Sequence, residues 1–156
     1  MDLNLTQPST KKVNGGHKAK IGGEAFENYF KRILEDIQAE TDSPIVCFRK
    51  HSNEVVGALT FKKMFGMVKK LGYLKGDLDY SITLRGGKTL FVECKSGNAK
   101  LTKEQEDMIE RYNNNDVPYV IFSQKLHDKF FNVVATNSFA SDKLKIRTYI
   151  DYMLGK

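Results

Sequence analysis

Two acidic residues and one lysine in the middle of this 156-residue chain have the types and spacing needed for metal-dependent chemistry. Asp79 begins one short segment, and Glu93 and Lys95 lie in the next with one residue between them. Neighbouring carboxylates repel each other unless a proton or cation lies between them, and hard oxygen ligands favour Mg²⁺ or Mn²⁺. An ammonium group beside such an ion could orient an attacking water or stabilise a phosphate in its transition state. These residue types therefore predict phosphodiester hydrolysis.

The two segments, 79–84 and 89–96, alternate apolar and polar residues as β-strands do. Glu93 and Lys95 then share one face of the second strand, and Cys94 points to the opposite, apolar face. The four residues between the segments include two glycines, which predicts a turn and an antiparallel hairpin. Cys94 is therefore a predicted core residue that could offer a metal only its main-chain carbonyl.

The register of this hairpin decides whether the two carboxylates meet, because only opposed residues of an antiparallel pair share a face. A two-residue turn would place Asp79 opposite Cys94. A three-residue loop over residues 85–87 places Asp79 opposite Glu93, with their Cα atoms about 4.5 to 5.5 Å apart. Such loops commonly need a glycine in the left-handed conformation, and Gly87 can provide it. We therefore predict a three-residue loop, or a bulge with the same effect.

The surrounding sequence predicts the order of elements of an α/β domain. In chain order these elements are a helix over Glu24 to Ile37, a strand over Pro44 to Phe48, the two hairpin strands, a helix from Thr102 to about Tyr112 and a strand over Val117 to Phe122. Gln105 stands in the capping-box position of the second helix. Phe131 to Ala135 and Leu144 to Ile150 are predicted as extra C-terminal strands, joined by residues 138–143.

The composition excludes several classes of protein. The chain is 40% hydrophobic and 28% charged, as expected of an ordinary globular domain, and no apolar run approaches the roughly 20 residues that span a bilayer. Cys47 and Cys94 are expected to be free thiols in a reducing compartment, so the expected location is the cytoplasm. The three histidines lack ligand spacing, and neither a serine-hydrolase elbow nor a phosphate-binding P-loop is present.

The net charge of +6 suits a polyanionic partner, and lysines gather in two places. Residues 1–19 are predicted to be a flexible basic arm, followed by a single nuclease domain over residues 20–156. Residues 59–71 form a basic amphipathic segment, whose lysines by default are the solvated side of a helix. The candidate DNA-binding residues are Lys62, Lys63, Lys69, Lys70, Lys75, Arg49, Lys50 and Ser52.

Asp79 followed by Glu93-Cys94-Lys95 resembles the PD-(D/E)XK nuclease signature, without the proline that often precedes the aspartate. Together with Lys75-Gly76 and the stretch 101–105, it is most similar to a stand-alone virus-type replication-repair nuclease (VRR-NUC) domain and to archaeal Holliday-junction resolvases. The similarity covers roughly residues 20–123. It implies a restriction-endonuclease-like α-β-β-β-α-β core, with a mixed central sheet flanked by helices, and DNA cleavage that depends on Mg²⁺ or Mn²⁺.

The families that the chain resembles also carry a glutamate on the first helix, after a glycine. Glu24 and Glu27 are the candidates here, and helical geometry favours Glu27, which lies at the border of the apolar face while Glu24 points to solvent. Gln105 either holds a metal-bound water or the Lys95 side chain, or only caps its helix. The expected metal ligands are Asp79, Glu93, the Cys94 main-chain carbonyl and, through water, Glu27; Lys95 positions the nucleophilic water, and Asp77 is the substitute if Asp79 fails.

The site residues predict a metal-dependent endonuclease. The resemblance implies that it acts on branched DNA as a Holliday-junction resolvase of phage or prophage origin, in DNA recombination and repair, in the cytoplasm of a bacterial or phage-infected cell. A resolvase cuts two strands symmetrically, which a two-fold homodimer does naturally. One alternative is the same chemistry on flapped, single-stranded or restriction-type duplex DNA. The other is a non-catalytic basic DNA-binding module.

Overall fold

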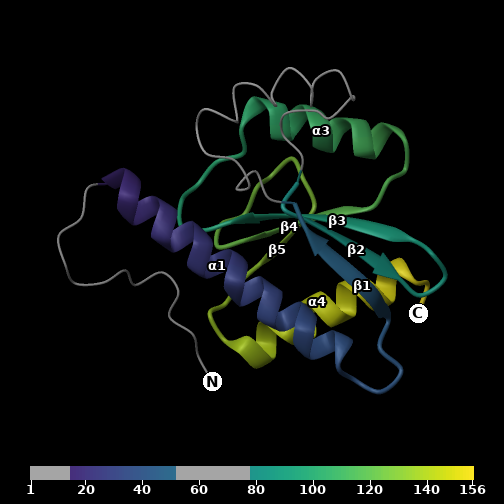
Figure 1. Ribbon diagram of the computed structural model, residues 1–156. Coiled ribbons are helices and arrows are strands. Elements are labelled where there is room, and N and C mark those ends of the chain that lie inside the picture. Colours follow the sequence, from purple (N-terminus) through teal and green to yellow (C-terminus); the bar gives the residue numbers. More distant parts are fainter. Residues whose placement is uncertain (1–14, 52–77) are drawn as a thin grey trace, which may run out of the picture.

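A computed structural model of the chain describes residues 15–51 and 78–156, with the side chains of the first helix described from Gly22 onward. The chain forms an α/β structure around one five-stranded mixed sheet (Figure 1). The elements are α1 (Gly15–Gln38), β1 (Ile45–Lys50), β2 (Tyr80–Leu84), β3 (Thr89–Lys95), α3 (Lys103–Asn114), β4 (Tyr119–Ser123), β5 (Asn132–Val134) and α4 (Phe139–Met153). α3 covers one face of the sheet, and α1 and α4 lie together on the other.

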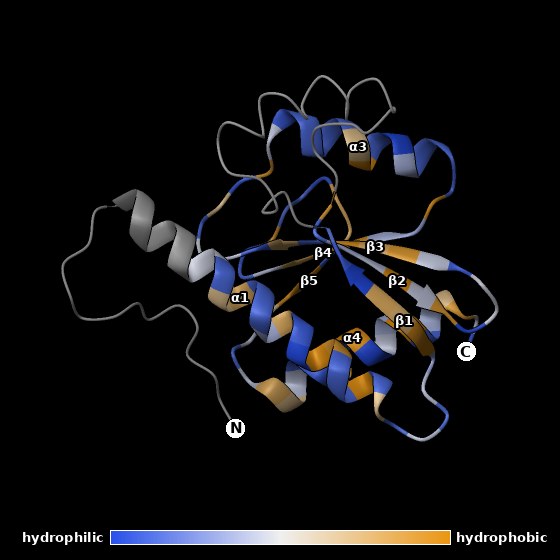
Figure 2. Cartoon of the chain, in the orientation of Figure 1, coloured by the Kyte–Doolittle hydropathy of each residue, from blue (hydrophilic) through white to orange (hydrophobic). Residues whose placement is uncertain are grey.

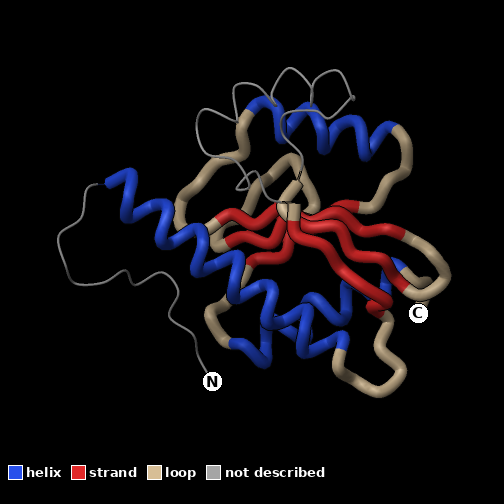
Figure 3. Tube along the Cα trace, in the orientation of Figure 1, coloured by secondary structure: helices blue, strands red, loops and turns tan. Residues whose placement is uncertain are grey.

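The strands follow one another across the sheet in the order β1-β2-β3-β4-β5. β2 is antiparallel to both β1 and β3, whereas β3, β4 and β5 are parallel. Four strands therefore end at one edge of the sheet, and β2 begins there. Figure 3 shows the strands side by side in the sheet, with helices on both of its faces. We call this edge, marked by Lys50, Asp79, Lys95 and Ser123, the carboxyl edge.

The larger core lies between the sheet and the helices α1 and α4. Phe122 of β4 packs at its centre, with ring centroids 5.1 Å from Phe26 and 5.0 Å from Phe30, both on α1. These residues recur at helical spacing, which explains why the first helix forms as predicted. Figure 2 shows hydrophobic residues along α1 and α4, whereas α3 is hydrophilic over most of its length. A smaller core lies beneath α3 and consists of Leu78, Ile109, Tyr119 and Ile121.

The hairpin has the register that brings the two acidic residues together. Tyr80 pairs with Val92, and Thr83 pairs with Thr89. The Leu84 N–H donates to the carbonyl oxygen of Lys88 at 2.7 Å, closing a three-residue loop. The predicted loop length is therefore confirmed. If the same pairing is continued by one residue beyond β2, Asp79 stands opposite Glu93.

Both glycines of this loop have a left-handed backbone, with φ of 89° at Gly86 and 88° at Gly87. We expect Gly87→Ala to lower the free energy of unfolding by about 1 to 2 kcal/mol, because a Cβ atom disfavours this conformation. Gly22 provides the control, since it lies inside α1 with open space around its Cα. Gly22→Ala should instead raise the free energy of unfolding by about 0.5 to 1 kcal/mol. Urea unfolding measures both, and equal effects of the two substitutions would contradict this account of the loop.

The predicted strand over residues 144–150 is wrong, because these residues belong to α4. The alternation of large apolar residues in this segment resembles a strand. In the structure the buried residues of the helix are Asp142, Ile146 and Ile150, which recur every four positions as on one face of a helix. The other predicted C-terminal strand, over 131–135, is confirmed as β5.

Residues 138–143 are not the predicted connector either. Ser138 is the N-cap position of α4 and the helix starts at the next residue. Asp142 is fully buried and accepts a hydrogen bond from the Tyr29 hydroxyl at 2.6 Å. It also accepts hydrogen bonds from the backbone and hydroxyl of Thr136. An inward-facing carboxylate interrupts the apolar pattern of this helix, and this is why the sequence misled the prediction.

Three further expectations concern the cysteines, membrane-spanning helices and the N-terminal arm. Both cysteines are free thiols, Cys47 exposed and Cys94 buried. Of the helices in the described ranges, none combines the length and apolar character needed to span a bilayer. Most of the predicted basic arm, residues 1–14, lies outside the described residues, and α1 already begins at Gly15.

Candidate active site

Asp79 is fixed at the carboxyl edge between β1 and β3. Its backbone carbonyl accepts a hydrogen bond from the His51 N–H at 2.7 Å, at the end of β1. Its Oδ2 atom accepts one from the Cys94 N–H at 2.8 Å, in β3. The Asp79 carboxylate is thus held by the sheet itself. Such anchoring keeps a metal ligand in a single position.

Glu93 is the most deeply buried of the three candidate acids Glu27, Asp79 and Glu93, with 2% of its surface exposed. Its Oε1 atom accepts a hydrogen bond from Gln105 Nε2 at 2.9 Å and lies 3.7 Å from the Lys95 ammonium group. Its Oε2 atom is buried without a hydrogen-bond partner. Burial, followed by repulsion from Asp79, raises the pKa of Glu93 well above its ordinary value. A buried oxygen of this kind is costly unless a proton or cation reaches it.

Glu27 joins the cluster from α1. Burial raises its pKa to about 7, with a further contribution from the charge of Asp79, while Lys50 opposes the shift. The Tyr80 hydroxyl donates a hydrogen bond to the Glu27 carbonyl oxygen at 3.1 Å, which fixes this turn of α1 against the sheet. Glu24, the rejected candidate, is exposed. The structure therefore brings Glu27 and both acids of the hairpin together, as the sequence predicted.

Gln105 caps its helix, as one of its predicted roles required, and its side chain contacts Glu93 rather than the predicted partner Lys95. Its backbone N–H donates to Thr102 Oγ1, and its own Oε1 accepts from the Thr102 N–H at 3.0 Å, which completes a capping box. The remaining amide nitrogen, Nε2, donates to Glu93. The Gln105 side chain thus helps to cap the N-terminus of α3 and orients the buried Glu93 carboxylate at the same time.

These two roles can be separated by substitution. Thr102→Ala removes only the cap and should lower the free energy of unfolding by about 1 kcal/mol. Gln105→Ala removes the cap and also frees Glu93, so we expect a similar loss of stability together with about 10- to 100-fold weaker binding of Mn²⁺. Calorimetric titration with Mn²⁺ measures the difference. Equal Mn²⁺ affinity in the two variants would show that Gln105 only caps the helix.

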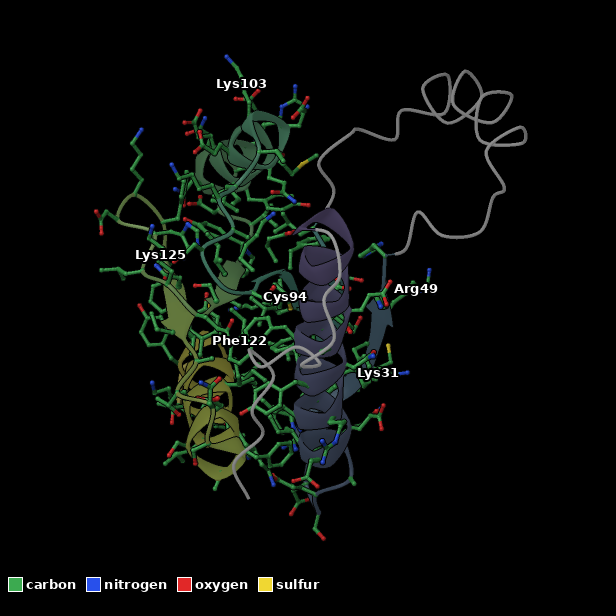
Figure 4. All side chains as sticks on the ribbon, turned by 90° about the vertical axis from the view of Figure 1, so that its left-hand side faces the viewer. Lys31, Arg49, Cys94, Lys103, Phe122 and Lys125 are labelled. Atoms are coloured by element: carbon green, nitrogen blue, oxygen red, sulfur yellow. The ribbon has the colours of Figure 1, made fainter. Side chains whose placement is uncertain are left out.

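Apart from Lys50, the remaining predicted site residues fall into three groups: Cys94 is buried, Arg49 is exposed, and the others lie outside the described residues. Cys94 lies in the larger core, and burial raises the pKa of its thiol well above the ordinary value. Figure 4 shows Cys94 and Phe122 inside the molecule, with Arg49, Lys103 and Lys125 projecting at its periphery. The candidate DNA-binding residues Ser52, Lys62, Lys63, Lys69, Lys70 and Lys75, and the substitute Asp77, lie outside the described residues.

Lys50 is the residue whose part in the cluster the sequence reasoning missed. It was expected only to contact DNA, but its ammonium group lies 3.6 Å from Glu27 Oε2. Lys50 is the last residue of β1 and pairs with Tyr80 across the sheet. This register places the end of β1 beside the start of β2, where Asp79 lies, and no local pattern in the sequence encodes it.

The oxygen atoms at the carboxyl edge suit a hard divalent cation. Within residues 22–51 and 78–156, no three or more His, Cys, Asp or Glu side chains are arranged to hold a metal ion. Mg²⁺ is usually bound by only one or two carboxylates, with water completing its octahedron. Asp79 and Glu93 meet that requirement, and the unpartnered Glu93 Oε2 atom provides a free oxygen ligand.

Comparisons with protein-family models, with curated proteins and with solved structures gave no match to this chain. The fold is an α/β structure with a mixed five-stranded sheet. Its candidate site joins three carboxylates and two ammonium groups at one edge of that sheet.

Proposed function

We propose that this chain is a metal-dependent endonuclease of the PD-(D/E)XK kind, which hydrolyses phosphodiester bonds in branched DNA. The observation that carries the proposal is the proximity of the Asp79 and Glu93 carboxylates, with the Lys95 ammonium group 3.7 Å from Glu93. Two oxygen ligands and an adjacent cation are the parts needed to hold a hard metal ion and to stabilise a phosphate.

The order of elements supports this assignment. Among the described residues, α1, β1, β2, β3, α3 and β4 come in the order of the restriction-endonuclease-like core that the sequence resemblance implies. Both acids and the lysine come from the hairpin β2–β3, and Glu27 comes from the first helix. β5 and α4 are additions to that core, and α4 packs beside α1.

Each residue of the site has a distinct task in the proposed reaction. Asp79 and Glu93 would bind Mg²⁺ or Mn²⁺, with the Cys94 main-chain carbonyl as a further ligand, and Gln105 keeps Glu93 in position. A bound divalent ion supplies a polarised phosphate and a water of lowered pKa. Lys95 holds the attacking water in line and stabilises the negative charge that develops on the phosphate.

The proposed substrate is DNA because the chain carries a net charge of +6 and two ammonium groups, those of Lys50 and Lys95, lie beside the acids of the site. Arg49, Lys103 and Lys125 project on the side of the molecule seen in Figure 4. The preference for branched DNA and the action as a homodimer follow from the resemblance to junction resolvases and from the need to cut two strands symmetrically.

The test is cleavage of four labelled substrates in Mg²⁺, namely a four-way junction, a flap, a single strand and a linear duplex. We expect paired symmetric cuts in the junction and much slower cutting of the duplex. Equal cutting of all four would remove the resolvase assignment but keep the nuclease. Binding of DNA without any cleavage in Mg²⁺ or Mn²⁺ would leave only a basic DNA-binding module.

A further inference from the structure

The ion pair between Lys50 and Glu27 differs from an ordinary surface pair. The Lys50 Nζ atom lies 3.6 Å from Glu27 Oε2, and the two side chains are 31% and 23% exposed. The pair between Lys31 and Glu35, on the outer side of α1, has a distance of 3.9 Å and exposures of 51% and 54%. The partly buried pair is less screened by water, so its charges interact more strongly.

Lys50 is also held in place by the sheet. It is paired with Tyr80 in the register of β1 and β2, and the Tyr80 hydroxyl is bonded to the backbone of Glu27. The strand that carries the lysine and the helix that carries the glutamate therefore share one neighbour. The position of the Lys50 ammonium group beside the acids is therefore a consequence of the fold.

The charges at the carboxyl edge limit how many metal ions it can hold. When a divalent ion displaces the protons of the acids, the carboxylates of Glu27, Asp79 and Glu93 face two ammonium groups, from Lys50 and Lys95, which leaves one negative charge. One divalent ion would turn this into one positive charge, which a phosphodiester group neutralises. With that phosphodiester group bound, a second ion would leave two positive charges uncompensated in a partly buried site, which is unfavourable.

We propose that Lys50 is a built-in cation which holds Glu27 and takes the place of a second divalent ion, so that each chain binds one ion, between Asp79 and Glu93. This inference rests on the proposed nuclease function and specifies its metal content. Glu27 then influences the bound ion through its ion pair with Lys50 and through its own negative charge, and it is not a ligand of the ion. It is a positioning residue in this scheme, and Lys50 becomes available to a phosphate of the substrate.

Titration of the protein with Mn²⁺, followed by calorimetry and by the electron paramagnetic resonance of the free ion, measures the number of bound ions directly. At about pH 8, well above the ordinary pKa of carboxylates, the unaltered chain should bind one Mn²⁺. Lys50→Met should bind two, with the first bound about tenfold more tightly, because a unit charge a few ångströms from a divalent ion is worth about that factor in water. Lys31→Met, which breaks the exposed pair on α1, is the matched control and should behave like the unaltered chain.

A double variant, Lys50→Met with Glu27→Gln, keeps the test decisive if the single variant does not fold. It removes a pair of opposite charges together, so it leaves no unpaired charge and the same net charge. We expect it to bind one Mn²⁺ with an affinity close to that of the unaltered chain. Loss of the ion in this variant would identify Glu27 as a metal ligand and overturn the proposal.

The outcomes for the unaltered chain separate the two levels of inference. Two bound Mn²⁺ ions would overturn the role given to Lys50 and leave the nuclease proposal standing. If the unaltered chain binds one ion, and Lys50→Met binds the same number of ions with the same affinity, the role given to Lys50 is also overturned. An absence of Mn²⁺ binding, in the presence and absence of DNA, would overturn the proposed function itself.

Discussion

Asp79→Asn should abolish DNA cleavage while leaving the protein folded and able to bind DNA. The asparagine Oδ1 atom can still accept the hydrogen bond from the Cys94 N–H, so the hairpin keeps its register. The charge that would hold the divalent ion is lost, however. Because a bound ion contributes several kcal/mol to stabilising the transition state, we expect the cleavage rate to fall by about a thousandfold or more.

The control for this substitution is Asp116→Asn, which makes the same chemical change at an exposed position after α3. Asp116 has a φ of 55°, a conformation that asparagine tolerates well. Cleavage of a four-way junction and its binding in Ca²⁺ are measured for both variants. Cleavage by Asp79→Asn within about tenfold of the unaltered rate would contradict a role for Asp79 in the chemistry, since one lost ligand should cost more than 1.4 kcal/mol.

Without divalent ions, the protein should lose stability as the pH rises from about 5 to about 8. The pKa of Glu27 is raised from 4.5 to about 7, and that of Glu93 is raised well above 4.5, in both cases mainly by burial. An acid with a raised pKa in the fold binds its proton more tightly there than in the unfolded chain. Its contribution is therefore fully present below pH 4.5 and is lost as the pH rises through the pKa of the folded state.

Mg²⁺ or Mn²⁺ should reverse this loss, since the ion takes the place of the protons between the ionised acids. We expect a decrease in Tm on the order of 5 °C over this pH range in EDTA, and recovery of most of it on adding Mn²⁺. Thermal melts at constant ionic strength measure both. In Glu93→Gln the decrease in Tm with pH should be smaller, and Mn²⁺ should not restore the Tm. A Tm in EDTA that stays constant or rises with pH would show that these acids are not buried together.

The hairpin and its acids were predictable because they depend on local rules. The length of the loop, the two glycines and the two-residue alternation of a strand are enough to set the register, and the register sets which acid faces which. The burial of Glu93 and its bond to Gln105 depend on where α3 lies. That position is a tertiary contact which no local pattern encodes.

The C-terminal helix and the Lys50–Glu27 pair could not be predicted for related reasons. In α4 one of the three buried residues is Asp142, whose carboxylate is satisfied by Tyr29 and Thr136 from elsewhere in the chain. A buried acid whose partners lie outside its own helix looks like a surface residue in the sequence. Lys50 likewise looks like any exposed lysine until β1 is placed next to β2.

Asp79 is tied to the sheet through both its main chain and its side chain, to His51 on one side and to the Cys94 amide on the other. The acid cannot swing away from the other residues of the site unless three strands separate. Affinity for the divalent ion should therefore disappear in the same cooperative transition that melts the sheet. The Cys94 amide, for its part, should exchange its hydrogen with solvent as slowly as the amides of the most protected strands.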